Sequence, residues 1–272
     1  LLMERLATLK KNQSLGLVPT MGALHIGHAA LVNRAVEENN AVVVSIFINP
    51  TQFNNPDDLN KYPQTITADL EILEKISKDI IVFVPAIEEM YTDEVKSTNY
   101  NFGGLEHVME GAFREGHFDG VGTIVEYLLT IVKPDKAYFC EKDFQQLLVI
   151  RRMVEDLSYA IDVIAVPTVR EEGGLAMSSR NNYLKEQQRK AAGELNRALR
   201  ILADRIRESA ANFESAEQKT AEHLEQRGLV VDYIAVRRAA DLARPRPGDR
   251  ELRALAAVWC GKTRLIDNVP IE

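Results

Sequence analysis

The sequence predicts an α/β fold, in which helices cover both faces of a parallel sheet and a smaller α+β unit follows. Through the first 170 residues, short apolar runs alternate with stretches of helical periodicity, as in a chain of βαβ units. The apolar runs carry almost no charge, which is typical of strands buried on both faces of a parallel sheet. After about residue 182 the composition changes to long charged helices and three closing apolar runs.

Five strands and four connecting helices are expected in the first part. The strands are expected at residues 15–19, 41–48, 80–84, 136–140 and 161–166. The segment 41–48 (AVVVSIFI) is the strongest of them, because it is uncharged and rich in β-branched residues. The helices are expected at residues 31–39 with a start near His25, 67–78, 117–132 and 143–157. In segment 67–78, Leu70, Leu73 and Ile76 are three residues apart, a spacing that suits a helix. The opening LLMERLATLKK reads as an amphipathic helix rather than a signal peptide.

The second part reads as a small α+β unit. Its helices are expected at residues 185–208 and 215–227, and its strands at 230–236, 252–258 and 263–268. The segment ARPRPGDR at residues 243–250 has the composition of a turn-rich loop. We expect the domain boundary after residue 176, which gives domains of residues 1–176 and 177–272.

Composition excludes several functional classes. The formal net charge of −7 argues against a broad nucleic-acid-binding face. Two cysteines, Cys140 and Cys260, are too few for a disulfide scaffold or a cysteine-based metal site, and they suggest a reducing compartment. No run of about 18 apolar residues occurs, so no membrane span is expected.

The segment VPTMGALHIGH at residues 18–28 is the clearest candidate for chemistry. A strand ends, a glycine allows a tight turn, and a helix begins, offering open N–H groups and a positive dipole end of about half a charge. His25 and His28 share one helical face, where they can bind phosphate oxygens, and Gly27 allows close approach of a ligand. Two ordinary surface histidines are the less favoured alternative, and a zinc site lacks a nearby Glu or Cys. The segment therefore points to phosphate chemistry.

Two further polar clusters also follow strands. Asn49 and Gln52, in FINPTQF, are neutral amides placed where a substrate would lie, although a turn stabilised by Asn-Pro explains them equally well. In EKDFQQ, Lys142 could neutralise phosphate charge and Gln146 lies about one turn into the next helix. The alternative is a charged helix start capped by Asp143.

The fourth cluster is MSSRN at residues 177–181, which follows PTVR. Its two hydroxyls and arginine would form a mobile clamp for a triphosphate, or equally an N-cap cluster before the long helix. Four such clusters in one α/β chain favour the functional interpretation. His117, in REGHF, is interpreted as structural rather than catalytic.

These residues resemble a known family. H-x-G-H followed by a Ser-rich basic loop resembles the adenylylating nucleotidyltransferases, which include class I aminoacyl-tRNA synthetases. The closer resemblance is to the pantothenate synthetase (pantoate–β-alanine ligase) family, from about residue 15 to the C-terminus. It is carried by VPTMGALHIGH, SIFINPTQF, EGAFREGHFDGV, AYFCEKDFQQLLVIRRMV, VPTVREEGGLAMSSRNNYL and TRLIDN.

The resemblance implies a Rossmann-like domain that binds nucleotide and pantoate, and a C-terminal α+β lid domain. It implies a two-step reaction in which pantoate attacks the α-phosphorus of Mg-ATP to give pantoyl adenylate and pyrophosphate. β-Alanine then attacks the acyl carbon, which gives pantothenate and AMP. A cytoplasmic homodimer that binds neither nucleic acid nor membrane is expected.

The resemblance also implies roles for particular residues. His28 would be the proton donor, with His25 and Lys142 as further catalytic residues. Gln52 and Gln146 would hold pantoate, and Gln52 would also lie near β-alanine. ATP would be contacted by Met21, Gly22, Ala23, Leu24, His25, Ile26, Gly27, His28, Cys140, Glu141, Lys142, Asp143, Val169, Met177, Ser178, Ser179 and Arg180. Metal ligands stay unassigned.

Some positions depart from the family pattern. Cys140 stands where glycine is usual before Glu-Lys-Asp, and Glu115 replaces the proline of an Arg-Pro-Gly-His-Phe motif. The other departures are Gln64, Tyr127, Thr130 and Gly173. Two competing hypotheses remain: a nucleotidyltransferase with another acceptor, against which the neutral glutamines argue, and a binding protein with little or no turnover, motivated by Cys140 and Glu115.

Overall fold

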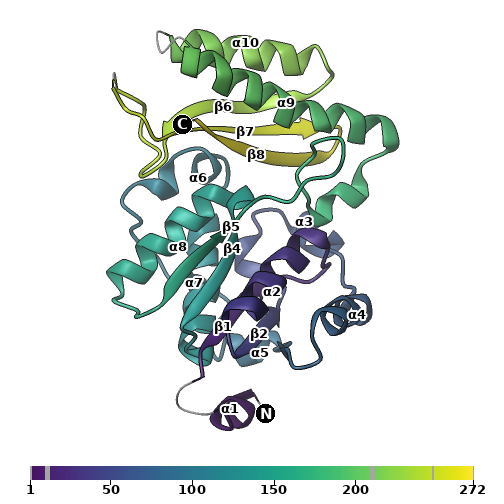
Figure 1. Ribbon diagram of the computed structural model, residues 1–272, viewed down its shortest axis with the longest axis vertical. Helices are drawn as coiled ribbons and strands as arrows, with labels where there is room; N and C mark the ends of the chain where they lie inside the picture. The colour runs from purple at the N-terminus through teal and green to yellow at the C-terminus, as the bar shows by residue number, and fades with distance from the viewer. Residues whose placement is uncertain (1, 10–12, 209–211, 247, 272) are drawn as a thin grey trace. The chain divides into compact units, whose positions relative to one another are not determined.

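The computed structural model describes residues 2–9, 13–208, 212–246 and 248–271 (Figure 1). The chain forms two compact units, which we call unit 1 (Leu1–Glu141 and Gln145–Pro167) and unit 2 (Lys142–Phe144 and Thr168–Glu272). The division falls before the expected boundary, and three residues after the fourth strand belong to unit 2. The functional boundary after residue 176 stays a prediction.

The sheet of unit 1 is parallel and has five strands, as expected. Its order is β3 (Ile81–Phe83), β2 (Ala41–Ile46), β1 (Leu15–Thr20), β4 (Lys136–Cys140) and β5 (Asp162–Val166). The central strands are almost wholly buried, which explains their lack of charge.

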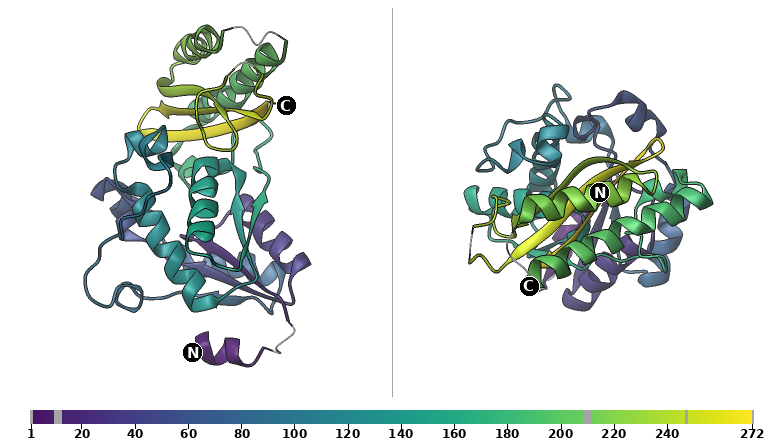
Figure 2. Two further views of the ribbon diagram at one scale, coloured as in Figure 1. Left: turned by 90° about the vertical axis from the view of Figure 1, so that its left-hand side faces the viewer. Right: turned by 90° about the horizontal axis from the view of Figure 1, so that it is seen from above.

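Helices cover both faces of this sheet, which confirms the predicted fold class. Helices α2 (Ile26–Glu38) and α4 (Ile66–Ile76) lie on one face, and α7 (His117–Val132) and α8 (Phe144–Asp156) on the other (Figure 2). This is the arrangement that right-handed crossovers produce when the chain returns from the edge strand β3 to β4.

Helix α4 buries a different face from the one expected. Leu70 is 42% exposed, whereas Leu73 and Asp69 are 2% and 1% exposed. The buried stripe therefore passes through Asp69 and Leu73, four residues apart, and Leu70 lies on the solvent side. An acidic side chain at a core position needs hydrogen-bond partners, and these lie in the site described below.

Short helices that the sequence pattern did not predict lie in the connections between the strands of the parallel sheet. They are η1 (Pro50–Gln52), α3 (Pro56–Lys61), α5 (Ile87–Met90), η2 (Leu105–His107), α6 (Glu110–Phe113) and η3 (Glu141–Asp143). The expected N-terminal helix is present as α1 (Leu2–Ala7), and residues 1, 10 and 11 of that expectation lie outside the described residues.

Unit 2 is built on a three-stranded antiparallel sheet with two helices on one face (Figure 1). The strands are β6 (Val230–Arg238), β7 (Leu252–Cys260) and β8 (Thr263–Ile271), and the helices are α9 (Glu186–Glu208) and α10 (Phe213–Glu225). A short helix, η4 (Ser179–Tyr183), precedes α9. Residue 247 of the expected loop lies outside the described residues.

Among the residues described, we find no helix with the length and apolar character needed to cross a membrane.

Candidate active site

The expected clusters of unit 1 lie at the carboxyl ends of neighbouring strands. The chain runs from β1 outward to β3 and then returns to β4, which pairs with β1 on its other side. In such sheets ligands bind beyond the carboxyl ends of the strands at this reversal. The histidine segment (residues 21–28) follows β1, Gln52 follows β2, and Cys140 ends β4.

The two histidines form a reciprocal cap at the start of α2. The Nδ1 atom of His25 accepts from the Gly27 N–H at 3.1 Å, and the Nδ1 atom of His28 accepts from the His25 N–H at 3.3 Å. The two rings stack with centroids 4.0 Å apart. A ring nitrogen that accepts a hydrogen bond carries no hydrogen, so each neutral ring carries its hydrogen on Nε2. Both side chains are thereby defined as Nε2–H donors, which suits phosphate oxygens.

The backbone N–H groups around this helix start are already bonded within the protein. Ala23 and Leu24 donate to the Asp69 carboxylate at 3.0 and 2.8 Å, and the N–H groups of His25 and Gly27 donate to the histidine rings. The expectation of open N–H groups is therefore wrong at these four positions. The capacity to bind an anion here rests on the imidazoles and on the helix dipole.

Asp69 is the functional-site residue that sequence reasoning missed. Its carboxylate is 1% exposed and also accepts from the Thr65 hydroxyl at 3.1 Å. It fastens a turn in which Gly22 has φ of +80° and Ala23 has φ of +50°. A left-handed conformation costs a non-glycine residue about 1–2 kcal/mol, so the turn depends on the Asp69 bonds. Asp69 shares a helix face with Leu73, and that signal was available in the sequence.

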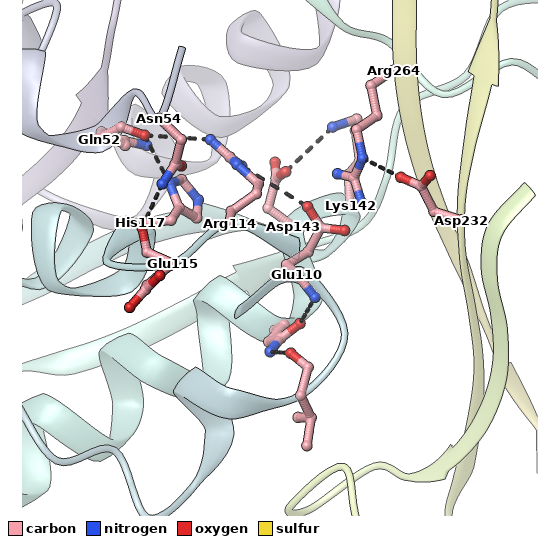
Figure 3. Close-up of polar contacts among 12 residues, drawn as sticks. Gln52, Asn54, Glu110, Arg114, Glu115, His117, Lys142, Asp143, Asp232 and Arg264 are labelled. Atoms are coloured by element: carbon pink, nitrogen blue, oxygen red, sulfur yellow. Dashed lines mark hydrogen bonds and ion pairs between the residues drawn. The ribbon is translucent and has the colours of Figure 1, made fainter. Parts of the chain in front are cut away.

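Two side chains hold the backbone of Gln52 in place, His117 at the start of α7 and Arg114 in the loop before it. The Gln52 carbonyl oxygen lies 2.9 Å from His117 Nδ1 and accepts from Arg114 Nη2 at 3.3 Å (Figure 3). Since a carbonyl only accepts, His117 Nδ1 carries its hydrogen. A Cβ on Gly120 would lie 2.3 Å from the Thr51 carbonyl oxygen, so this glycine permits α7 to approach η1. His117 therefore supports Gln52, as its structural interpretation predicted.

Asn49 anchors the turn before η1. It is 1% exposed, and its amide donates to the Gly120 carbonyl at 2.9 Å. Its oxygen accepts from the hydroxyls of Tyr91 at 2.5 Å and Thr51 at 3.1 Å. Burial raises the pKa of the Tyr91 hydroxyl, which keeps it protonated as a donor. These contacts support the interpretation of Asn49 as a turn residue.

The two adjacent glutamines of α8 differ in their surroundings. Gln145 is 3% exposed, donates to the carbonyls of Leu105 and Val108, and accepts from the Glu110 N–H at 3.0 Å. Gln145 thus holds the loop between η2 and α6. Gln146 is half-buried, and its assignment to pantoate stays a prediction.

Apart from Glu141, which belongs to unit 1, the remaining expected ATP contacts lie in unit 2. Lys142 Nζ lies 3.3 Å from Asp143 Oδ1 (Figure 3). Ser178 caps η4 by accepting from the Arg180 N–H at 3.3 Å, so the cap serves this short helix rather than α9. Met177 is joined to Val169 by a backbone hydrogen bond of 2.9 Å. The residues of the expected clamp therefore lie at the start of η4, and their role as a clamp stays a prediction.

Within the described ranges, no group of three or more His, Cys, Asp or Glu side chains is arranged to hold a metal ion.

Two of the positions that depart from the family pattern differ in exposure. Cys140 is half-buried at the end of β4, and Glu115 is exposed, with its carbonyl accepting from Asn54.

Comparison with known proteins decides the family. The family model for pantoate-beta-alanine ligase matches residues 2–270. The chain belongs to this family. It is 48% identical over 263 residues to a pantothenate synthetase of Pseudomonas paraeruginosa, covering 96% of this chain and 93% of the relative. It is 42% identical over 279 residues to a pantothenate synthetase of Christiangramia forsetii, covering 100% and 97%.

Solved structures agree with this assignment. The pantothenate synthetase of Thermus thermophilus matches with a TM-score of 0.91 and 41% identity, covering 99% of this chain and 97% of that one. The pantoate-beta-alanine ligase of Francisella tularensis, solved in complex with beta-gamma ATP and beta-alanine, matches with a TM-score of 0.84 and 34% identity, covering 99% and 94%.

Proposed function

We propose that this protein condenses pantoate with β-alanine in an ATP-dependent reaction that releases AMP and pyrophosphate. Membership of the pantoate–β-alanine ligase family supports the overall reaction. The observation that carries the residue-level proposal is the stacked pair of His25 and His28, with both Nε2–H groups as donors.

In the proposed first step, a pantoate carboxylate oxygen attacks the α-phosphorus of ATP. A new phosphorus–oxygen bond forms, the bond to the bridging oxygen of pyrophosphate breaks, and pantoyl adenylate results. The Nε2–H donors of His25 and His28 stabilise the charge that develops on the phosphate oxygens, and His28 donates toward the departing pyrophosphate. Lys142 adds a further positive charge for the phosphates.

In the proposed second step, the β-alanine amine attacks the acyl carbon of the adenylate. A carbon–nitrogen bond forms, the carbon–oxygen bond to AMP breaks, and the amine loses a proton to the surroundings. Gln52 and Gln146 hold pantoate through neutral amides, which add no charge next to its carboxylate. Because the backbone of Gln52 is fastened by His117 and Arg114, its position is well defined for this role.

ATP is proposed to enter as its Mg²⁺ complex, since Mg²⁺ is commonly held through substrate phosphates and waters. The remaining proposed ATP contacts are Met21, Gly22, Ala23, Leu24, Ile26, Gly27, Cys140, Glu141, Asp143, Val169, Met177, Ser178, Ser179 and Arg180. We also propose a homodimer in the cytoplasm and a lid role for residues 177–272. Unchanged hydrogen exchange around residues 175–182 on addition of ATP would argue against the lid.

The decisive assay is exchange of pyrophosphate into ATP with pantoate alone. The proposal predicts exchange without β-alanine, because the adenylate forms first. A panel of other carboxylic acids in the same assay tests the alternative of a different acceptor. Folded protein that binds ATP but shows no exchange would overturn adenylylation.

His28→Asn separates the two functions of that side chain. The Asn oxygen can replace Nδ1 as the acceptor for the His25 N–H, but the variant lacks the Nε2–H donor. We expect exchange to fall about 100-fold with little loss of stability. The matched control is His107→Ala, at a side chain that is 80% exposed. Equal rates for the His28 variant and the wild type would remove His28 from the mechanism.

A further inference from the structure

The closing motif TRLIDN has no role in the reaction described so far. Its last two residues, Asp267 and Asn268, lie on β8 and are each 4% exposed. Asp267 receives four hydrogen bonds. Arg170 donates to both carboxylate oxygens at 2.7 and 2.9 Å, Asn196 Nδ2 donates at 3.2 Å, and the Asn268 N–H donates at 2.8 Å.

Asn268 connects the same strand to the segment that carries Lys142. Its Nδ2 group donates to the Lys142 carbonyl oxygen at 2.9 Å. The neighbouring strand β7 holds this segment as well, because the Arg253 guanidinium lies 3.8 Å from the centre of the Phe144 ring. These two contacts explain why residues 142–144 fold with unit 2.

Arg170 connects Asp267 to the Ser-Ser-Arg segment (residues 178–180). Arg170 forms an isolated antiparallel bridge with Ala176, and its guanidinium also donates to the Gly174 carbonyl at 3.2 Å. The Met177 N–H then bonds to the Val169 carbonyl. The hairpin that leads into residues 178–180 is therefore fixed at its base by Asp267.

We propose that Asp267 and Asn268 are positioning residues that set the spacing between Lys142 and the Ser-Ser-Arg segment for ATP use. One buried pair fastens both segments, Asn268 through the Lys142 carbonyl and Asp267 through Arg170. The two connections carry this role, because a buried ion pair is by itself only weak evidence for stabilisation. The inference rests on the proposed function, since Lys142 and residues 178–180 are its proposed ATP contacts.

Asn268→Asp tests the first connection. The substitution keeps the shape of the side chain but replaces the donor with an oxygen that faces the Lys142 carbonyl. Loss of a buried hydrogen bond with such a mismatch predicts about a tenfold rise in the KM for ATP or fall in kcat of pyrophosphate exchange. The KM for pantoate stays within about twofold, because Gln52 and Gln146 belong to unit 1. Asn268→Ser, which retains a shorter donor, should recover part of the loss.

Asp267→Asn tests the second connection and should affect the same ATP parameters, because Arg170 loses its charged partner. Glu217→Gln is the matched control. Glu217 also accepts from a backbone N–H, that of Val236 at 2.6 Å, and it pairs with Arg237 within unit 2. Neither of these two partners is a proposed ATP contact. Its kinetic constants should match those of the wild type.

The outcomes separate the two proposals. Wild-type protein without exchange would contradict the proposed function, whereas active wild type and unchanged ATP constants in the Asp267 and Asn268 variants would overturn only the positioning role. If these variants do not fold, hydrogen exchange of the wild-type protein decides. A non-hydrolysable ATP analogue should slow exchange in residues 264–271 together with residues 140–145. Protection at 140–145 without any at 264–271 would refute the proposal.

Discussion

Asp69→Asn is the sharpest test of how the histidine segment is held. The wild-type carboxylate accepts from the Ala23 and Leu24 N–H groups at 3.0 and 2.8 Å in a site that is 1% exposed. Asn keeps one acceptor oxygen and converts the other into an NH2 group. One of the two backbone bonds is therefore lost, and a donor is placed against a donor.

The expected loss of stability follows from these contacts. A hydrogen bond to a charged group contributes about 1.5–3 kcal/mol, so losing one predicts a decrease of about 2–3 kcal/mol in the free energy of unfolding. Where the lost bond is the one from Ala23, it no longer offsets the left-handed conformation of that residue, which has φ of +50° and itself costs about 1–2 kcal/mol. The turn should relax, and pyrophosphate exchange should fall at least about tenfold because His25 and His28 move with it.

Denaturant unfolding and pyrophosphate exchange, measured on the same preparation, provide the assay. Glu71→Gln is the control, because it removes a carboxylate from the exposed side of the same helix. A change of less than about 0.5 kcal/mol in the free energy of unfolding of Asp69→Asn, the size of an ordinary surface substitution, would contradict the role of Asp69 in holding the turn. A loss of stability with unaffected exchange would show that the turn does not position the histidines.

Two further predictions test other parts of the fold. Gly120→Ala should displace η1, because the added Cβ would meet backbone atoms of Thr51 and Gln52. We expect the KM for pantoate to rise about tenfold. Gly173→Ala is the control, since no atom lies within 4 Å of an added Cβ there, and it should leave that KM unchanged. The pKa of Glu38 is lowered from 4.5 to about 2, first through its hydrogen bond with Arg34. Between about pH 2 and pH 4.5 the unfolded chain therefore binds more protons than the folded chain. The stability of the wild-type protein should fall as the pH drops through this range. In Glu38→Gln the melting temperature should fall less over the same range; an identical slope would contradict the assigned pKa.

The regular elements were accessible from the sequence because their signals are local. The boundaries predicted for α7 and β4 coincide with those observed, since each segment carries a strong local pattern of apolar residues. The short helices between residues 50 and 113 were missed because their conformation depends on distant partners. The loop between η2 and α6, for example, is held by Gln145, whose side chain bonds to residues 37 and 40 positions earlier in the chain.

The candidate site was predicted only in part, because only its local signals appear in the sequence. The histidine pair shows in the sequence as a spacing, and the structure adds that its Nδ1 atoms are occupied by backbone donors. No spacing indicates that Asp69 occupies the N–H groups of residues 23 and 24, since 45 residues or more separate the partners. The pattern did contain one usable clue, an acidic residue on the apolar stripe of α4.

The three residues Lys142–Phe144 limit how the chain can be divided. They belong to unit 2, although the residues immediately before and after them belong to unit 1. A fragment that begins at Thr168 would lack the carbonyl that Asn268 binds and the ring that Arg253 covers. A single cut before Thr168 therefore separates Lys142–Phe144 from the C-terminal sheet that they contact, and an exchange of modules between homologues keeps these contacts only if the three residues are carried together with that sheet.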